Sequence, residues 1–277
     1  MVDLKDYTLA VVANHNVFGF LKQLVVCLQW KGILFRSLCV GDAGLLDTEV
    51  EWLEMVLGNR LTRFPLAKQF KQEGIVTQDG TYREIISQRI PFLRYVFGEC
   101  AGAPVLQLDA DTAIIDNDFS LVDPNSDLTL TVREVTSLEH ALGKNEKEYP
   151  NLGVVFWNRP ERCYDFLSAW EVVQRTTNPC VGQFEQGFFY RAMSSSDFSR
   201  LSVQRVHCRY YNCYRAKWIE SQTSVLHYKG DRRVHRMRSP FYERCRRLNC
   251  TAFGVEGPIE EDMLYHGRSM CETIRLF

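Results

Sequence analysis

The sequence predicts an α/β fold with a mainly parallel central sheet flanked by helices. Near the N-terminus, apolar runs typical of strands alternate with amphipathic helical patterns, and strand–helix–strand units of this kind build parallel sheets. Further along, residues 104–112 read PVLQLDADT, a short apolar run followed at once by two aspartates. This pattern is typical of a buried strand that delivers polar side chains to the edge of a sheet, where open α/β sheets bind ligands.

The first two strands are expected at residues 7–13 and 33–40. Between them, apolar residues recur at the i, i+3, i+4 and i+7 spacing of an amphipathic helix, which Gly32 is expected to end. The loop after the first strand lacks the G-x-G-x-x-G pattern. This absence argues against a dinucleotide-binding domain.

The next elements are helical. Thr48 and Glu51 fit a capping box for a helix that ends at Gly58. Residues 82–97 also have a helical pattern, which Pro91 is expected to bend or divide. This helix leads into the strand that carries the two aspartates.

The later part of the chain continues the alternation. Residues 127–132 are expected to form a strand, and the polar residues 137–150 a surface loop. A further strand covers residues 151–158, and Pro160 then opens a helix. No internal repeat or linker interrupts the pattern, so we expect one continuous domain.

The composition is that of an ordinary globular protein, with 45% hydrophobic and 24% charged residues among 277. The N-terminal residues have no signal-peptide pattern, and no run is long enough to span a membrane. We therefore expect a cytoplasmic protein, with its ten cysteines reduced. Cys208 and Cys213, and then Cys245 and Cys250, also have a spacing at the edge of that of zinc sites.

The charge is unevenly distributed. Residues 201–250 carry a net charge of +9 within a chain of net charge −1. A basic region of this kind can hold phosphates, nucleic acid or an acidic partner. Aromatic residues lie among the arginines, so nucleic-acid binding is one hypothesis for the region. These aromatic residues are Tyr210, Tyr211, Tyr214 and Trp218.

Asp109 and Asp111 are the first candidates for a site. They lie two residues apart, so in extended backbone their side chains point the same way. Two hard oxygen ligands side by side suit Mg2+ or Mn2+ bound together with the phosphates of a nucleotide. An Asp-x-Asp pair alone is a common motif, and the prediction depends on the motifs that come later in the chain.

Three later motifs come in order. Residues 151–158 read NLGVVFWN, and Glu185-Gln186 comes after them. Residues 225–233 then read VLHYKGDRR, an apolar strand that delivers His227 and is followed by a glycine and arginines. An imidazole can be a third metal ligand, and arginines match phosphate geometry.

In this order the four motifs resemble the GT-A nucleotide-sugar glycosyltransferases, and most of all glycosyltransferase family 8, the glycogenin and bacterial galactosyltransferase type. The resemblance covers residues 7–235 by motif order. It implies a GT-A domain over residues 1–238. Residues 239–277 have no counterpart in the family and are expected to form a basic or helical extension packed on the same domain. The resemblance also implies Mn2+ or Mg2+ held by Asp109, Asp111 and His227, together with the diphosphate of a nucleotide sugar.

The resemblance assigns further roles residue by residue. Gly230 and Arg233 would grip the diphosphate, with arginine where the family usually has lysine. Asn151 and Gly153 would border the donor sugar and the acceptor, and an arginine on the helix before the metal strand, Arg83, would reach the donor. The family pair at the sugar appears here as Glu185 and Gln186. The family's acidic residue that meets the nucleotide base is missing in the first loop, and Asn14 is the donor-binding candidate there.

These motifs predict a metal-dependent glycosyltransferase that moves a sugar, from a UDP-sugar by preference, to a hydroxyl of a glycan, a protein or another acceptor. Retention of configuration is expected if Gln186 faces the anomeric carbon, and inversion if Glu185 acts as a base toward the acceptor. Two alternatives stay open. One is a nucleotidyltransferase of similar sheet, and the other is a nucleic-acid-binding or DNA-modifying sugar transferase that uses the basic region.

Overall fold

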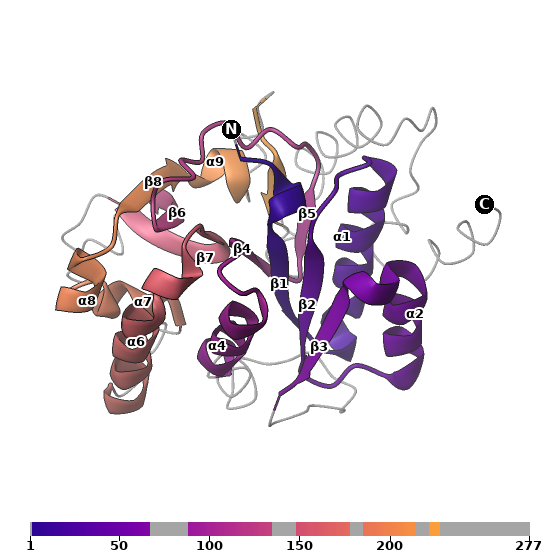
Figure 1. Cartoon of the computed structure of the whole chain (residues 1–277), viewed down its shortest axis with the longest axis horizontal. Helices are drawn as coiled ribbons and strands as arrows, with labels where there is room; N and C mark the ends of the chain where they lie inside the picture. Colours follow the sequence, from indigo (N-terminus) through magenta and orange to yellow (C-terminus); the bar gives the residue numbers. More distant parts are fainter. Residues whose placement is uncertain (1, 67–87, 135–147, 178–184, 214–221, 228–277) are drawn as a thin grey trace.

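The computed structural model describes residues 2–66, 88–134, 148–177, 185–213 and 222–227. Within them, the centre of the molecule is a seven-stranded sheet of order β3-β2-β1-β4-β7-β6-β8 (Figure 1). The strands are β1 (Thr8–Ala13), β2 (Ser37–Asp42), β3 (Leu61–Pro65), β4 (Val105–Asp109), β6 (Leu128–Glu134), β7 (Glu148–Trp157) and β8 (Val203–His207). A second sheet pairs β5 (Thr112–Ile114) with β9 (Val225–His227).

The main sheet is parallel except for one strand. β1 pairs in parallel with β2 and β4, β2 with β3, and β6 with β8. β7 is antiparallel to both of its neighbours, β4 and β6. The predicted α/β class with a mainly parallel central sheet is therefore confirmed.

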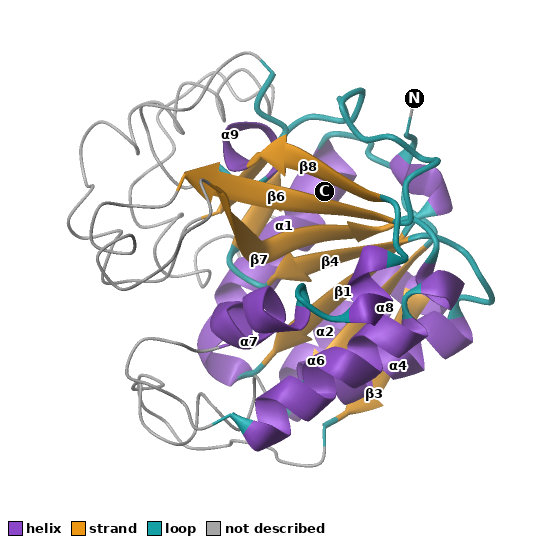
Figure 2. Cartoon of the chain, turned by 90° about the vertical axis from the view of Figure 1, so that its left-hand side faces the viewer, coloured by secondary structure: helices purple, strands orange, loops and turns teal. Residues whose placement is uncertain are grey.

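Helices cover both faces of the sheet (Figures 1 and 2). The helices are α1 (Phe18–Trp30), α2 (Asp47–Leu57), α4 (Arg89–Glu99), α6 (Tyr164–Thr176), α7 (Glu185–Ala192) and the single turns α8 (Ser196–Ser199) and α9 (Cys208–Tyr211). α1 and α2 belong to one core cluster, and α4, α6 and α7 to another.

Successive strand residues enter the two clusters alternately. Leu9 and Val11 of β1 pack in the cluster of α1, whereas Ala10 packs in the cluster of α4. β4 does the same, with Leu106 on the first face and Val105 on the other. Because both faces are buried, these strands are almost continuously apolar in sequence.

The boundaries of the predicted helices are partly corrected. α1 ends beside Gly32, which has a positive φ of 61°, as expected. α2 begins at Asp47, and the side chain that accepts a hydrogen bond from the Leu46 amide is Glu49, at 2.8 Å. The predicted pair Thr48 and Glu51 was therefore two residues too late, because an aspartate already serves as the first helical residue.

Two further predictions are corrected. The second strand begins at Ser37 rather than at residue 33, because Ile33 and Phe35 are buried in the loop before it. Pro91 does not divide a helix, since it lies in the first turn of α4, where backbone amides have no intrahelical partner.

Some predictions concern residues that the structure does not describe. These are the helical pattern before residue 88, the polar loop up to residue 147 and the extension 239–277. The last residues of the predicted loop, 148–150, open strand β7. No helix in the described part of the chain is both long and apolar enough to cross a membrane.

Candidate metal centre at the edge of the sheet

Two of the predicted metal ligands lie where the main sheet meets the small one. Asp109 is the last residue of β4, and Asp111 lies in the turn between β4 and β5. The Thr112 hydroxyl donates a 2.8 Å hydrogen bond to the Asp109 carbonyl and stabilises this turn. The spacing predicts extended backbone here, but the two carboxylates are in fact brought together by the turn.

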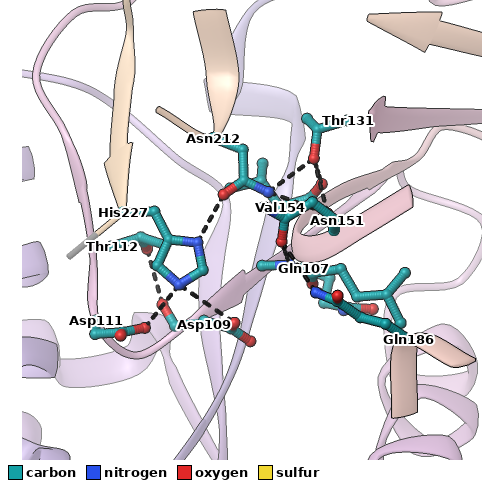
Figure 3. A network of polar contacts seen from close by, with 12 residues as sticks. Gln107, Asp109, Asp111, Thr112, Thr131, Asn151, Val154, Gln186, Asn212 and His227 are labelled. Carbon is teal, nitrogen blue, oxygen red and sulfur yellow. Dashed lines mark hydrogen bonds and ion pairs between the residues drawn. The ribbon is translucent and has the colours of Figure 1, made fainter. Parts of the chain in front are cut away.

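The third predicted ligand, His227, is the last residue of β9. It lies opposite Thr112 in the antiparallel pairing of β5 and β9, beside the turn. Ligand atoms of Asp109, Asp111 and His227 all lie within 4.8 Å of one another. The His227 Nε2 atom lies 3.1 Å from Asp111 Oδ1 and 3.5 Å from Asp109 Oδ2 (Figure 3). The imidazole is buried and the carboxylates are partly exposed, so the cluster faces outward through its oxygens.

Gly153 of β7 makes room for this cluster. A Cβ atom at this position would overlap Cε1 and Nδ1 of the His227 ring and would lie 3.1 Å from Asp109 Oδ2. The glycine is therefore needed for close approach between strand and imidazole rather than for an unusual backbone angle. Gly153 therefore lies against two of the candidate metal ligands, next to the place where the donor sugar is expected.

Asn151 and Gln186 lie on the other side of Gly153. The Asn151 Oδ1 atom accepts hydrogen bonds from Gln186 Nε2 at 3.2 Å and from the Gly153 amide at 3.4 Å. Because a backbone amide can only donate, the Asn151 atom that faces it is an oxygen, and the Gln186 atom that faces this oxygen is a nitrogen. The bond thus orients the Gln186 amide, with its carbonyl oxygen turned away from Asn151.

Arg89, which the sequence patterns did not indicate, connects the metal candidate to α7. Its Nη2 atom donates to Asp109 Oδ1 at 2.8 Å, and its Nε atom lies 2.9 Å from Glu185 Oε1. Arg89 is the first residue of α4, the helix before the metal strand. The arginine expected on that helix was assigned to Arg83, which lies outside the described residues, whereas Arg89 fits the same description and reaches the cluster.

Glu185 begins α7 with a buried carboxylate. Its contact with Arg89 is an ion pair whose angles fall outside those of a hydrogen bond. Burial raises the pKa of Glu185 to about 7, and the nearby Asp109 carboxylate adds to this shift while the Arg89 guanidinium opposes it. Perturbed carboxylates of this kind cluster at functional sites.

Asn14 follows β1 at the same edge of the sheet. Val12 pairs with Asp109 in the parallel register of β1 and β4, so the end of β1 lies beside the cluster. The Asn14 side chain is buried, and its Oδ1 atom accepts no hydrogen bond from the described residues. A buried acceptor of this kind is usually satisfied by water or by a ligand.

The remaining site predictions are outside the described part of the chain or find no support in it. Gly230 and Arg233, assigned to the diphosphate, are not described. Cys208 and Cys213 are buried free thiols, and the metal-capable group found among the described residues does not include them. Tyr211 is buried and stacks on Phe119 at 5.2 Å, so it is a core residue rather than a surface for bases.

No protein-family model and no curated protein sequence matches this chain. Solved structures do match it. The galactosyltransferase LgtC, in complex with donor and acceptor sugar analogues, is 15% identical with a TM-score of 0.55, and the match covers 92% of this chain and 99% of that one. An active-site mutant of LgtC matches over the same shares with a TM-score of 0.58.

A second match comes from another glycosyltransferase. GlyE of Streptococcus pneumoniae is 11% identical with a TM-score of 0.52, and the match covers 81% of this chain and 55% of GlyE. At identities this low, the structural matches establish a shared fold. The sheet order, the helices on both faces and these matches together show that the chain has the GT-A glycosyltransferase fold.

Proposed function

We propose that this protein is a metal-dependent glycosyltransferase that moves a sugar from a nucleoside-diphosphate sugar, a UDP-sugar by preference, to a hydroxyl acceptor. The observation that carries the proposal is the cluster of Asp109, Asp111 and His227 at the carboxyl edge of a sheet with the GT-A fold. Open α/β sheets bind their ligands at this edge, where neighbouring strands connect in opposite directions. In this sheet β1 and β4 flank that point.

The three side chains fit a divalent ion. Two carboxylate oxygens and one imidazole nitrogen form a mixed set that suits Mn2+ better than Mg2+, which prefers oxygen ligands. When bound, such an ion would offset the negative charge that develops on a departing diphosphate. The partly exposed carboxylates leave a side open toward solvent from which a donor can approach.

The residues around the cluster suggest how a donor would lie. The buried Oδ1 of Asn14 is an acceptor for an N–H group of the nucleotide, next to the strand that carries Asp109. The hydrogen bond from Gln186 Nε2 to Asn151 leaves the Gln186 carbonyl oxygen free to face a donor sugar. An oxygen at the face of the anomeric carbon would support retention of configuration, which is our working proposal.

Arg89 and Glu185 would hold this arrangement in place. The guanidinium of Arg89 contacts Asp109 and Glu185, so it fixes the position of one metal ligand relative to α7. Because Glu185 is buried and paired with Arg89, a supporting role fits it better than that of a base that must meet the acceptor. Gly230, Arg233 and Arg83 remain predictions for the donor site.

The alternative of nucleic-acid binding is not favoured. Of the aromatic residues in the hypothesis, Tyr211 is buried in the core and Tyr210 is partly buried against it, whereas Tyr214 and Trp218 lie outside the described residues. LgtC and GlyE, whose structures match the fold, are glycosyltransferases. The nucleotidyltransferase alternative is also not favoured, because the loop after β1 lacks the glycine-rich pattern that binds phosphates.

The proposal is tested by release of nucleoside diphosphate from a panel of UDP- and GDP-sugars, with Mn2+ or with chelator. We expect release from one donor with Mn2+ only, and a loss of at least about 100-fold in Asp111→Asn, the scale of removing a preorganised electrostatic group. Asp165→Asn, an exposed aspartate of α6, is the matched control and should keep full activity.

Retention is tested separately on the product. Proton NMR of the first product formed should show the anomeric configuration of the donor. An inverted product would contradict retention and would return Glu185 to the role of a base. No release with any donor would contradict the proposed function itself.

A further inference from the structure

Asn212 occupies the centre of a buried polar network behind the metal candidate. It follows the short helix α9, and its side chain is completely buried. Its Oδ1 atom lies 2.6 Å from His227 Nδ1. Its Nδ2 atom donates to Thr131 Oγ1 at 2.8 Å and to the Asn151 carbonyl at 3.0 Å (Figure 3).

The neighbours of Asn212 determine which way its amide points. The Asn151 carbonyl oxygen can only accept a hydrogen bond, so the Asn212 atom that faces it is the nitrogen. The single hydrogen of the Thr131 hydroxyl lies toward the carbonyls of Asn151 and Val154, at 2.8 and 2.9 Å, so the hydroxyl oxygen accepts from the Asn212 nitrogen. The opposite end of the amide, which faces His227, must then be the oxygen.

This orientation determines the tautomer of His227. An amide oxygen 2.6 Å from Nδ1 requires that Nδ1 carry a hydrogen, so a neutral ring has its lone pair on Nε2. The Nε2 atom is the one that faces Asp111 and Asp109, at 3.1 and 3.5 Å. A lone pair directed at two carboxylates is repelled unless a cation lies between them, and that is the arrangement a metal ligand needs.

We propose that Asn212 is a positioning residue that holds His227 in the Nδ1–H tautomer and so presents Nε2, together with Asp109 and Asp111, to a divalent cation. The proposal rests on the proposed function for the identity of the cation. The role of Asn212 goes beyond the proposed function, because Asn212 would contact neither the donor nor the metal. Thr131 and the carbonyls of Asn151 and Val154 in β7 support this role, because they fix the orientation of the Asn212 amide on which the tautomer depends.

The tautomer can be measured without any metal or donor. We would record two-bond proton–nitrogen NMR spectra of the histidine rings in the full chain, with His227→Gln to assign the resonance. We expect Nδ1 of His227 to carry the hydrogen that Asn212 Oδ1 accepts. A ring whose Nδ1 carries no hydrogen would overturn the proposal.

The consequence for metal binding is tested by titration of Mn2+ alone into the wild type, Asn212→Leu and Asn212→Asp. Asn212→Leu removes the acceptor at similar volume, and we expect its Mn2+ dissociation constant to rise about 10- to 100-fold. Asn212→Asp keeps an acceptor at Nδ1 but loses the donor to the Asn151 carbonyl, so it should retain more of the Mn2+ affinity than Asn212→Leu does. Urea unfolding in chelator establishes that each variant is folded.

The outcomes separate the two proposals. A folded Asn212→Leu with unchanged Mn2+ affinity would overturn the role of Asn212. A wild type with the expected tautomer that binds Mn2+, but no nucleotide sugar, would support the role of Asn212 and contradict the proposed function.

Discussion

Gly153 and His227 set the tightest geometric requirement of the site. The imidazole packs directly on the backbone of β7, and its two nitrogens are fixed by Asn212 and by the two aspartates. Every polar atom of the ring is thus placed by a neighbour rather than by solvent. At the residue scale, function should therefore be sensitive to a single methyl group at Gly153 and to a single charge at Glu185.

The first prediction is that Gly153→Ala displaces His227. The new Cβ would overlap the imidazole in a buried region that cannot easily yield, and overpacking of this kind typically costs about 1–3 kcal/mol. We expect a Mn2+ dissociation constant at least about 10-fold higher, the scale for a disturbed ligand shell, measured by titration calorimetry. The control is Gly98→Ala, an exposed position in α4 where a Cβ meets nothing within 4 Å, which should bind Mn2+ as the wild type does. Equal affinity in both variants would contradict the prediction.

The second prediction concerns the pH dependence of stability through Glu185. Burial raises the pKa of Glu185 from 4.5 to about 7, so between these values the folded state binds more protons than the unfolded state. The stability contributed by the protonated carboxyl is therefore lost as the pH rises from about 4.5 to about 7, by roughly 3 kcal/mol at most. Urea unfolding in chelator across this range should show the decrease in the wild type relative to Glu185→Gln.

Glu51→Gln is the control for the loss of one negative charge in Glu185→Gln, because Glu51 is exposed. If the wild type and Glu185→Gln gave parallel curves of unfolding free energy against pH, the buried carboxyl would not titrate as described.

At the scale of elements, the site depends on a turn and a short pair of strands. The turn after β4 brings Asp109 and Asp111 together, and the pairing of β5 with β9 brings His227 to them from a segment more than a hundred residues away in the chain. The helix α7 supplies Glu185 and Gln186 from the opposite side. The site is therefore built from short elements, namely the turn after β4, the strands β5 and β9, and helix α7, at the edge of the main sheet.

The third prediction tests the turn. Thr112→Val removes the hydroxyl that donates to the Asp109 carbonyl, and a buried hydrogen bond of this kind is worth about 1 kcal/mol. We expect that loss in the free energy of unfolding, together with weaker Mn2+ binding. Thr176→Val is the matched control, because Thr176 donates to the Val172 carbonyl at the same 2.8 Å but on the exposed side of α6. A turn that does not position the ligands would leave Mn2+ affinity equal in the two variants.

The elements themselves were largely predictable from sequence, but their edges were not. The apolar spacing predicts helix α1 and its end beside Gly32. It does not predict the start of β2, because Ile33 and Phe35 lie before the strand and yet are as apolar and as buried as the residues within it. The turn after β4 was also missed, since alternation predicts extended backbone through Asp111. Burial and hydrogen bonding separate these cases, and neither can be read from composition.

At the scale of the whole molecule, a mainly parallel sheet covered on both faces leaves the carboxyl ends of its strands as the place for a site. Asn14, Asp109 and Gly153 come from distant parts of the sequence and meet there because β1, β4 and β7 are neighbours in the sheet. Motif order in the sequence was enough to indicate Asp109, Asp111 and His227, which come together as the candidate metal centre. It could not indicate Asn212 or Arg89, because their roles arise from contacts across the fold and not from any local pattern.

The measurement that tests the central claim most directly is calorimetric titration of UDP, with GDP as the second ligand, in Mn2+ and in chelator. We expect nucleotide binding that requires Mn2+. Mn2+ should in turn bind more tightly in the presence of the nucleotide, because coupling between ligands is reciprocal. Asp109→Ala/Asp111→Ala should abolish this binding, and Asp165→Asn should preserve it. Nucleotide binding of equal strength in chelator, or in the double variant, would contradict the assignment of Asp109, Asp111 and His227 as the metal centre of a nucleotide-sugar site.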